Sequence, residues 1–155
     1  LWGLFCELPQ PVVCALHGHV IGSGVEIALL CDLRIAADNA MFSMPEVKLG
    51  MMPAAGGTQT MTRNIGIPSS LDLLLLQRQI TPLEAKKIGM GHRVVPREKL
   101  EQESLELASF LARKDANLLQ ASKTALRRGS DLSLSQGLDL EERLTLQSWY
   151  RTHGG

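Results

Sequence analysis

The sequence has 155 residues, of which 45% are apolar and 21% charged. This composition is typical of a globular protein with a buried core and excludes a disordered chain. Sixteen basic side chains balance sixteen acidic ones, so no overall field attracts nucleic acid or an anionic membrane, and we expect neither as a partner. The longest apolar runs fall far short of the roughly 20 residues that span a bilayer.

The cysteines and the N-terminus bear on the compartment. Cys6, Cys14 and Cys31 form neither a CxxC pair nor a set with metal-ligand spacing. Free thiols in apolar segments behave as small hydrophobes, which favours a reducing compartment, either the cytoplasm or, in a eukaryote, the mitochondrial matrix. The first residues lack targeting character, and the chain does not begin with methionine, which suggests a partial chain.

The first part of the sequence predicts an α/β arrangement. Residues 11–16 form a short apolar run bounded by Pro and Gly, which is typical of a buried strand. A glycine-punctuated loop follows over residues 17–24, then an apolar helix over 25–31 and a second strand over 33–37. This β-α-β order predicts a parallel sheet.

The remainder of the chain is predicted to be mostly helical. Prolines and glycines make residues 40–59 a loop, and residues 92–95 form a brief extended segment. Thr81 and Glu84 have the spacing of a capping box at the start of one helix. Helices are predicted over residues 58–65, 69–76, 81–88, 98–113, 117–127 and 134–150. No repeat or linker divides the sequence, so one domain is expected.

A turn of small residues, Gly22, Ser23 and Gly24, precedes the apolar helix. The first N–H groups of a helix have no internal partner and lie at the positive end of its dipole, so such a turn can bind developing negative charge. The spacing excludes a dinucleotide-binding fingerprint, and the P-loop Lys-Ser/Thr pair is absent. Two interpretations stay open: an oxyanion hole, or packing in which small residues let strand and helix approach.

Two glutamates are the candidate chemical groups. Glu26 lies one turn into an otherwise apolar helix, so we expect its carboxylate to be at least partly buried. The alternative is an exposed glutamate favoured by the helix dipole. Glu46 follows Pro45 on a stiffened loop, and taken alone it has the pattern of an ordinary solvated carboxylate. Buried carboxylates are suited to general acid or base catalysis.

Other catalytic classes find little support in the sequence. The serines lack a GxSxG elbow, and no cysteine has the local pattern of a thiol protease. His17 and His19 could ligate a metal, yet no HExxH or Cys/His set completes a site. We therefore expect them to hydrogen bond within the loop, and we predict no metal site. His92 and His153 have no evident role.

Two long segments resemble the enoyl-CoA hydratase/isomerase (crotonase) superfamily. The first comprises residues 10–18 and 22–32, and the second comprises residues 42–50 and 53–59, at the spacing that the family has. The likeness continues through residues 81–89 and covers nearly the whole chain. It implies an α/β fold of crotonase type, the β-β-α superhelix shared by ClpP and crotonase, truncated here and with a helical C-terminal half.

The resemblance also implies an organisation and a ligand. One crotonase-like domain would span residues 1–155, with its core at 9–95 and a helical trimerisation region at 96–155. Members bind an acyl-CoA thioester and need no cofactor beyond the CoA of the substrate, and trimers or dimers of trimers are usual. We therefore expect an acyl-CoA ligand and a homo-oligomer. Arg127 and Arg128 could pair with phosphates, but a solvated helix end is the simpler explanation.

By the same resemblance, the thioester oxygen would bind between two backbone N–H groups, one of them that of Ser23. Glu26 and Glu46 would flank the C2–C3 double bond of a 2-enoyl-CoA, one activating water for attack on C3 and the other supplying the proton to C2. Possession of both carboxylates favours a hydratase within the family. The residues implied to line the substrate site are Gly22, Gly24 and Ala54.

The sequence departs from the family pattern at several places. Members carry roughly an N-terminal third that precedes the first strand seen here, and it supplies the other oxyanion N–H and most of the adenine pocket. They also continue into a further C-terminal helix. Ala54 stands where glycine is frequent, and Thr60 where arginine is frequent. The alternatives are another crotonase-fold acyl-CoA activity (isomerase, hydrolase or decarboxylase) and a catalytically silent oligomerising module.

Overall fold

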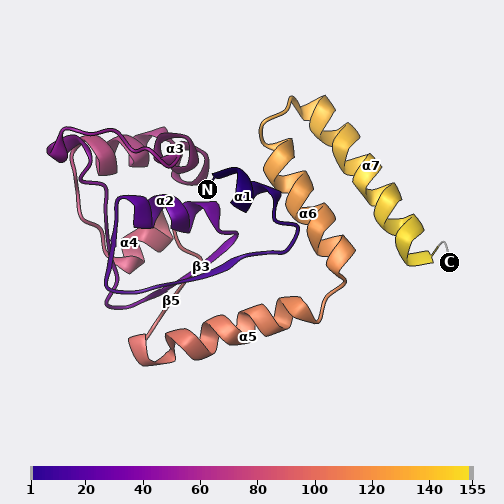
Figure 1. The fold of residues 1–155 in the computed structure, drawn as a ribbon, viewed down its shortest axis with the longest axis horizontal. Coiled ribbons are helices and arrows are strands. Elements are labelled where there is room, and N and C mark those ends of the chain that lie inside the picture. Colours follow the sequence, from indigo (N-terminus) through magenta and orange to yellow (C-terminus); the bar gives the residue numbers. More distant parts are fainter. Residues whose placement is uncertain (1, 154–155) are drawn as a thin grey trace. The chain divides into compact units, whose positions relative to one another are not determined.

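The computed structural model describes residues 2–153, apart from the side chains of Trp2, Cys6, Thr152 and His153. The chain divides into two compact units. One comprises Leu1–Glu7 and Val12–Ala108, and the other comprises Leu8–Pro11 and Ser109–Gly155. Strands of the described residues occur in the first unit, whereas the second contains the helical hairpin formed near the C-terminus (Figure 1).

Two small parallel sheets form the centre of the first unit. The strands are β1 (Val13–Leu16), β2 (His19–Ile21), β3 (Leu33–Ala37), β4 (Met41–Ser43) and β5 (Arg93–Val95). Strands β1, β3 and β5 form one sheet in that order, and β2 pairs with β4 in the other. Successive strands therefore alternate between the sheets, and their parallel pairing confirms the predicted parallel α/β architecture.

The helices follow the strands in a repeated β-β-α order. Those of the described residues are α1 (Trp2–Glu7), α2 (Ser23–Leu30), α3 (Gly57–Leu75), α4 (Pro82–Lys87), α5 (Leu100–Ala112), α6 (Ala116–Gly129) and α7 (Leu134–His153), with 3₁₀ turns at Val47–Leu49 and Arg97–Lys99. The chain order is β1-β2-α2 and then β3-β4-α3. Each β-β-α unit thus contributes one strand to each sheet and one helix to the layer beside them.

The strand predictions were correct where the local pattern was long enough. The structure confirms the strand at residues 33–37, and β1 begins later than the predicted residue 11. The two pair in parallel, with Val13 opposite Leu33. By contrast, β2 and β4 lie in segments that were predicted to be loops, and this prediction was wrong. Each has three residues, and each is stabilised by its pairing with the other, which a local pattern does not reveal.

Helix α3 joins two helices that the sequence predicted separately. Gly66 interrupts it with φ 75° and ψ 163°, a conformation that glycine adopts readily. Pro68 follows in the first turn of the continuation, where its missing N–H costs little. Helix α4 begins with the predicted capping box, because the Thr81 side chain accepts the N–H of Glu84 and the Glu84 side chain accepts that of Thr81.

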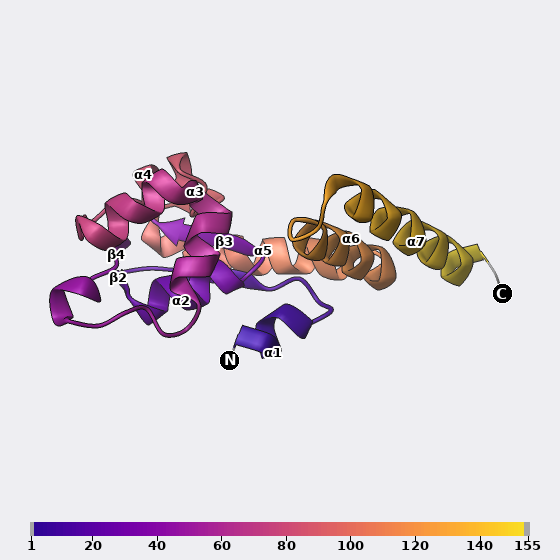
Figure 2. The same cartoon turned by 90° about the horizontal axis from the view of Figure 1, so that it is seen from above.

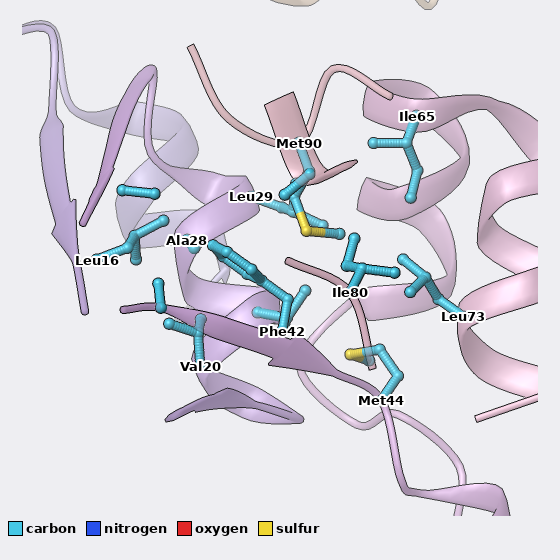
Figure 3. Packing of buried hydrophobic residues seen from close by; sticks show 14 of the residues in the cluster. Leu16, Val20, Ala28, Leu29, Phe42, Met44, Ile65, Leu73, Ile80 and Met90 are labelled. Atoms are coloured by element: carbon cyan, nitrogen blue, oxygen red, sulfur yellow. The ribbon is translucent and has the colours of Figure 1, made fainter. Parts of the chain in front are cut away.

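The main hydrophobic core of the first unit holds α2 against the sheets (Figure 3). Phe42 of β4 is buried among Leu29 of α2, Ile80 and Met90. The backbone of Phe42 also exchanges hydrogen bonds with that of Ile80, at 3.1 and 2.9 Å. Burying a Phe or Leu side chain stabilises a fold by roughly 1.5–3 kcal/mol, so this packing fixes the helix that carries Glu26.

Strand β3, the middle strand of the β1-β3-β5 sheet, is buried on both faces. Ala36 of β3 belongs to the main core, whereas its neighbours Ile35 and Ala37 belong to a second cluster with Val95 and Leu100. This arrangement follows from the alternation of side chains along a strand, and burial on both faces is usual for parallel sheets.

A buried arginine fastens β3 to the helices. Arg34 is 4% exposed, and its guanidinium donates to the carbonyl oxygens of Met90 and Cys31 and to the side chain of Asn64 on α3. Its backbone N–H donates to Nδ1 of His92 at 3.0 Å. Burial, reinforced by the Arg34 charge, lowers the pKa of His92 below its ordinary value. His92, which had no evident role in the sequence, is therefore part of this cluster.

Cys14 and Cys31 lie near α2, and neither forms a disulfide among the described residues. Cys31 is buried at the end of α2, where its Sγ donates to the carbonyl of Ile27 at 3.4 Å, and Cys14 of β1 is partly buried. A hydrogen bond with Cys31, together with burial, raises the pKa of the Cys14 thiol. A thiol with a raised pKa stays protonated and unreactive at neutral pH. Both behave as the small hydrophobes that were predicted, while the side chain of Cys6 lies outside the described residues.

In the second unit, α6 and α7 lie side by side as a hairpin (Figures 1 and 2). Asp115 caps α6 by accepting the N–H of Leu118 at 2.9 Å, and Lys123 donates to the carbonyl of Gln10 at 2.8 Å. No helix among residues 2–153 combines the length and apolar character that crossing a membrane requires. The single-domain organisation with a core at 9–95 stays a prediction.

Candidate active site

The candidate site is built around Gly22, which directly follows β2 and caps the start of α2. Its φ of 53° lies in the left-handed region, which favours glycine. The Gly22 N–H donates to the carbonyl of Ser43 at 2.9 Å, which continues the pairing of β2 with β4. The Gly22 carbonyl accepts the N–H groups of Val25 and Glu26 at 2.8 and 3.1 Å and so starts the helix.

Ser23 and Gly24 contribute the first two N–H groups of α2, for which a helix has no preceding carbonyl. Both residues are exposed, so a ligand oxygen can approach this positive helix end. Among the described residues, a Cβ added at Gly24 would meet only Val20 Cγ1 within 4 Å, at an ordinary 3.8 Å. Close packing therefore does not explain a glycine at this position, and the oxyanion-hole interpretation keeps its support.

Glu26 is buried, as the apolar character of its helix predicted. Its side chain is 1% exposed, and Oε1 accepts two backbone hydrogen bonds, from the N–H of Ala55 at 2.9 Å and from that of Gly57 at 2.8 Å. Ala55 lies just before α3, and Gly57 is its first residue. They fix the carboxylate in one orientation and satisfy one of its oxygens.

Glu46 is also buried, at 8% exposure, so it is not the solvated carboxylate that its loop would suggest in isolation. It follows β4 and stands immediately before the 3₁₀ turn Val47–Leu49. A Cβ added at Gly22 would lie 2.6 Å from its Oε1. Its Oε2 is buried and has no hydrogen-bond partner among the described residues. Leaving a buried acceptor unsatisfied costs about 1–3 kcal/mol, so this oxygen is available to a donor from a ligand.

The structure thus brings the turn of small residues that begins at Gly22, Glu26 and Glu46 together at the N-terminal end of α2. The backbone of Gly22 binds the N–H of Glu26 on one side and lies under the carboxylate of Glu46 on the other. Ala54 is exposed and adjoins Ala55, whose N–H holds Glu26. The arrangement combines two buried carboxylates with exposed backbone donors, which is the equipment for moving protons beside an oxygen that develops negative charge.

The backbone donors of Ala55 and Gly57 were not identified from the sequence. The small residues at the start of α3 marked a loop, but a sequence pattern does not show which distant side chain a loop N–H will bind. A glycine directly before a predicted helix, on a segment resembling a catalytic family, is the feature that could have drawn attention to Gly57, which the structure places as the first residue of α3.

Other candidate groups lie elsewhere. His17 and His19 are exposed, and among the described residues no cluster of three or more His, Cys, Asp or Glu side chains could hold a metal ion. Arg127 and Arg128 belong to the second unit. The His153 side chain lies outside the described residues.

Known proteins that resemble this sequence are named as enoyl-CoA hydratases or their relatives. A family model for enoyl-CoA hydratase/isomerase matches residues 1–153. A protein of Mycobacterium bovis named a probable enoyl-CoA hydratase is 39% identical over 143 residues, which is 92% of this chain and 56% of that protein. The 2,3-dehydroadipyl-CoA hydratase of Escherichia coli is 38% identical over 144 residues, covering 93% of this chain and 56% of that protein.

Solved structures show the same fold. The enoyl-CoA hydratase of Bacillus anthracis superposes with a TM-score of 0.90 at 35% identity, over 93% of this chain and 56% of that one. An enoyl-CoA hydratase of Polaromonas sp. JS666 gives 0.93 at 27% identity, over 99% and 60%. The chain therefore spans little more than half the length of the relatives that it matches. With a family model matched over nearly all its residues and a shared fold, the chain belongs to the enoyl-CoA hydratase/isomerase family.

Proposed function

We propose that the protein is an enoyl-CoA hydratase, which adds water across the C2–C3 double bond of a 2-enoyl-CoA thioester. The observation that carries the proposal is the pair of buried carboxylates, Glu26 and Glu46, at the exposed N-terminus of α2. The names of its relatives support the same reaction. Two carboxylates at one site suit hydration, because one proton must be removed from water and one must be added to carbon.

The helix end would hold the thioester. The N–H of Ser23, together with a further backbone donor, binds the carbonyl oxygen, and Gly22, Gly24 and Ala54 line the substrate. As water attacks C3, negative charge moves onto this oxygen as an enolate. Backbone donors placed for the enolate oxygen contribute about 3–4 kcal/mol each to transition-state stabilisation.

The unequal surroundings of the carboxylates support an assignment of their roles. Glu26, oriented by two N–H donors on Oε1, accepts the proton of the attacking water while the new C3–O bond forms. Glu46, with a buried Oε2 free of protein partners among the described residues, delivers a proton to C2 as the enolate collapses. Proton exchange with solvent then returns both groups to their starting states.

The experiment follows the loss of enoyl-thioester absorbance when the purified protein meets a short 2-enoyl-CoA. Parent, Glu26→Gln and Glu46→Gln are compared with Glu101→Gln, which changes an exposed glutamate on α5. We expect kcat to fall roughly 100- to 10,000-fold in either site variant, while the α5 variant keeps the parent rate. A folded parent without turnover, or site variants as fast as the parent, would contradict the proposal.

The proposed reaction also bears on the need for a cofactor. Water and the thioester are the only reactants, so we propose no cofactor and no metal.

We propose a homo-oligomer, a trimer or a dimer of trimers, because large apolar side chains are exposed on α6 and α7, including Leu126 at 77% and Leu134 at 82%. Cys14 and Cys31 form no disulfide among the described residues, which supports a reducing compartment, either the cytoplasm or, in a eukaryote, the mitochondrial matrix.

A further inference from the structure

Gly57 occupies an unusual position beside Glu26, because it both binds the carboxylate and leaves room for it. Its N–H donates to Oε1 at 2.8 Å in a buried hydrogen bond. We propose that Gly57 is a positioning residue, whose missing side chain and N–H together hold the Glu26 carboxylate at the angle that the reaction needs. The kinetic part of this inference rests on the proposed function.

The space around Gly57 is too small for any side chain. A Cβ built there would lie 2.7 Å from Glu26 Oε1 and 3.0 Å from Glu26 Cγ, and it would lie 3.0 Å from Pro53 Cβ. Its backbone is not in the left-handed region, unlike that of the preceding Gly56 with φ 92°. The requirement for glycine at position 57 is therefore one of space at the carboxylate, and a helix start accepts alanine as far as φ and ψ are concerned.

The clash has a predictable direction of relief. The carboxylate is the end of a flexible side chain, whereas Gly57 is fixed by the first turn of α3. An added methyl group therefore pushes Oε1 away from the N–H groups of Ala55 and Gly57 and leaves the fold in place. Displacing a reacting group by about 1 Å costs about 100-fold in rate, and this loss falls on kcat because the thioester still binds at the α2 end.

A double-mutant cycle separates this role from a structural one. Gly57→Ala and Glu26→Gln are measured singly and together, and Gly91→Ala serves as the matched control. Gly91 has an ordinary φ, and a Cβ there would meet its nearest neighbour at 3.9 Å. We expect Gly57→Ala to lower kcat about 100-fold with little change in KM, and to have no further effect in the Glu26→Gln background. The control should match the parent.

The opposite results overturn the inference. If Gly57→Ala leaves kcat unchanged, or lowers it equally in both backgrounds, Gly57 does not act through Glu26. If Gly57→Ala fails to fold, Pro53→Gly is added, which removes one of the contacting Cβ atoms and leaves the carboxylate contact. The folded double variant is then expected to show the same loss of kcat, and parent-like turnover would refute the role.

A crystal structure of Gly57→Ala keeps this test separate from that of the proposed function. A parent that does not hydrate 2-enoyl-CoA would refute the function, but the position of the Glu26 carboxylate could still be compared between parent and variant. A carboxylate rotated away from the N–H of Ala55 supports the positioning role. An Oε1 that still accepts both backbone hydrogen bonds would overturn it.

Discussion

At the scale of single residues, Glu26 and Glu46 show which contacts a sequence reveals. The burial of Glu26 could be predicted, because Val25, Ala28 and Leu29 around it are apolar and belong to the core. The burial of Glu46 could not, because it arises from the distant Gly22 against its Oε1. The resemblance to a known family pointed to both glutamates. The two N–H donors on Glu26 could not be predicted, and neither could the Glu46 Oε2, which has no hydrogen-bond partner among the described residues.

Arg34 is expected to be the most sensitive polar residue outside the candidate site. Its replacement by alanine leaves the carbonyl oxygens of Met90 and Cys31 buried without this donor and opens a cavity. We predict that Arg34→Ala lowers the free energy of unfolding by about 3 kcal/mol, measured by urea denaturation. Arg63→Ala on the exposed side of α3 should change it by less than about 0.5 kcal/mol. Equal effects of the two substitutions would contradict this account.

At the scale of elements, helices were predicted better than strands. Helix α4 was identified by a capping box that lies within four neighbouring residues, and α3 was found as two segments because Gly66 and Pro68 mark the break. Strands β2 and β4 have three residues each and pair with one another, and a partner distant in sequence is not visible in a local pattern. Their pairing matters for the site, because its continuation through Gly22 and Ser43 places the start of α2 beside Glu46.

The end of α3 offers a test of backbone strain. Gln77 has φ 55° and is the one non-glycine residue with positive φ in the described part of the chain. A side chain in this region costs about 1–2 kcal/mol relative to glycine, and glycine is favoured just beyond a helix. We predict that Gln77→Gly raises the melting temperature by a few degrees, roughly 4 °C per kcal/mol at this size. Gln79→Gly, at an exposed residue with negative φ, should lower it. A decrease in both variants would refute the strain argument.

At the scale of the whole molecule, the family and the β-β-α architecture could be predicted because two long segments carry them in register. No sequence pattern of this kind predicts how the two units are placed or how many chains assemble. The exposed apolar side chains of α6 and α7 are what motivate the proposed homo-oligomer. We predict that sedimentation velocity at micromolar concentration gives a species of three or six chains. A single species with the mass of one chain would contradict the proposal.

The most direct test of the central claim is the fate of one oxygen atom. The purified protein is mixed with a short 2-enoyl-CoA in water enriched in ¹⁸O, and the mass of the thioester product is measured by mass spectrometry. A hydratase predicts a 3-hydroxyacyl-CoA that is heavier by one labelled water, with the label at C3 and its formation dependent on Glu26 and Glu46. An isomer of unchanged mass, free CoA with a labelled acid, or unreacted thioester would contradict hydration by these two carboxylates.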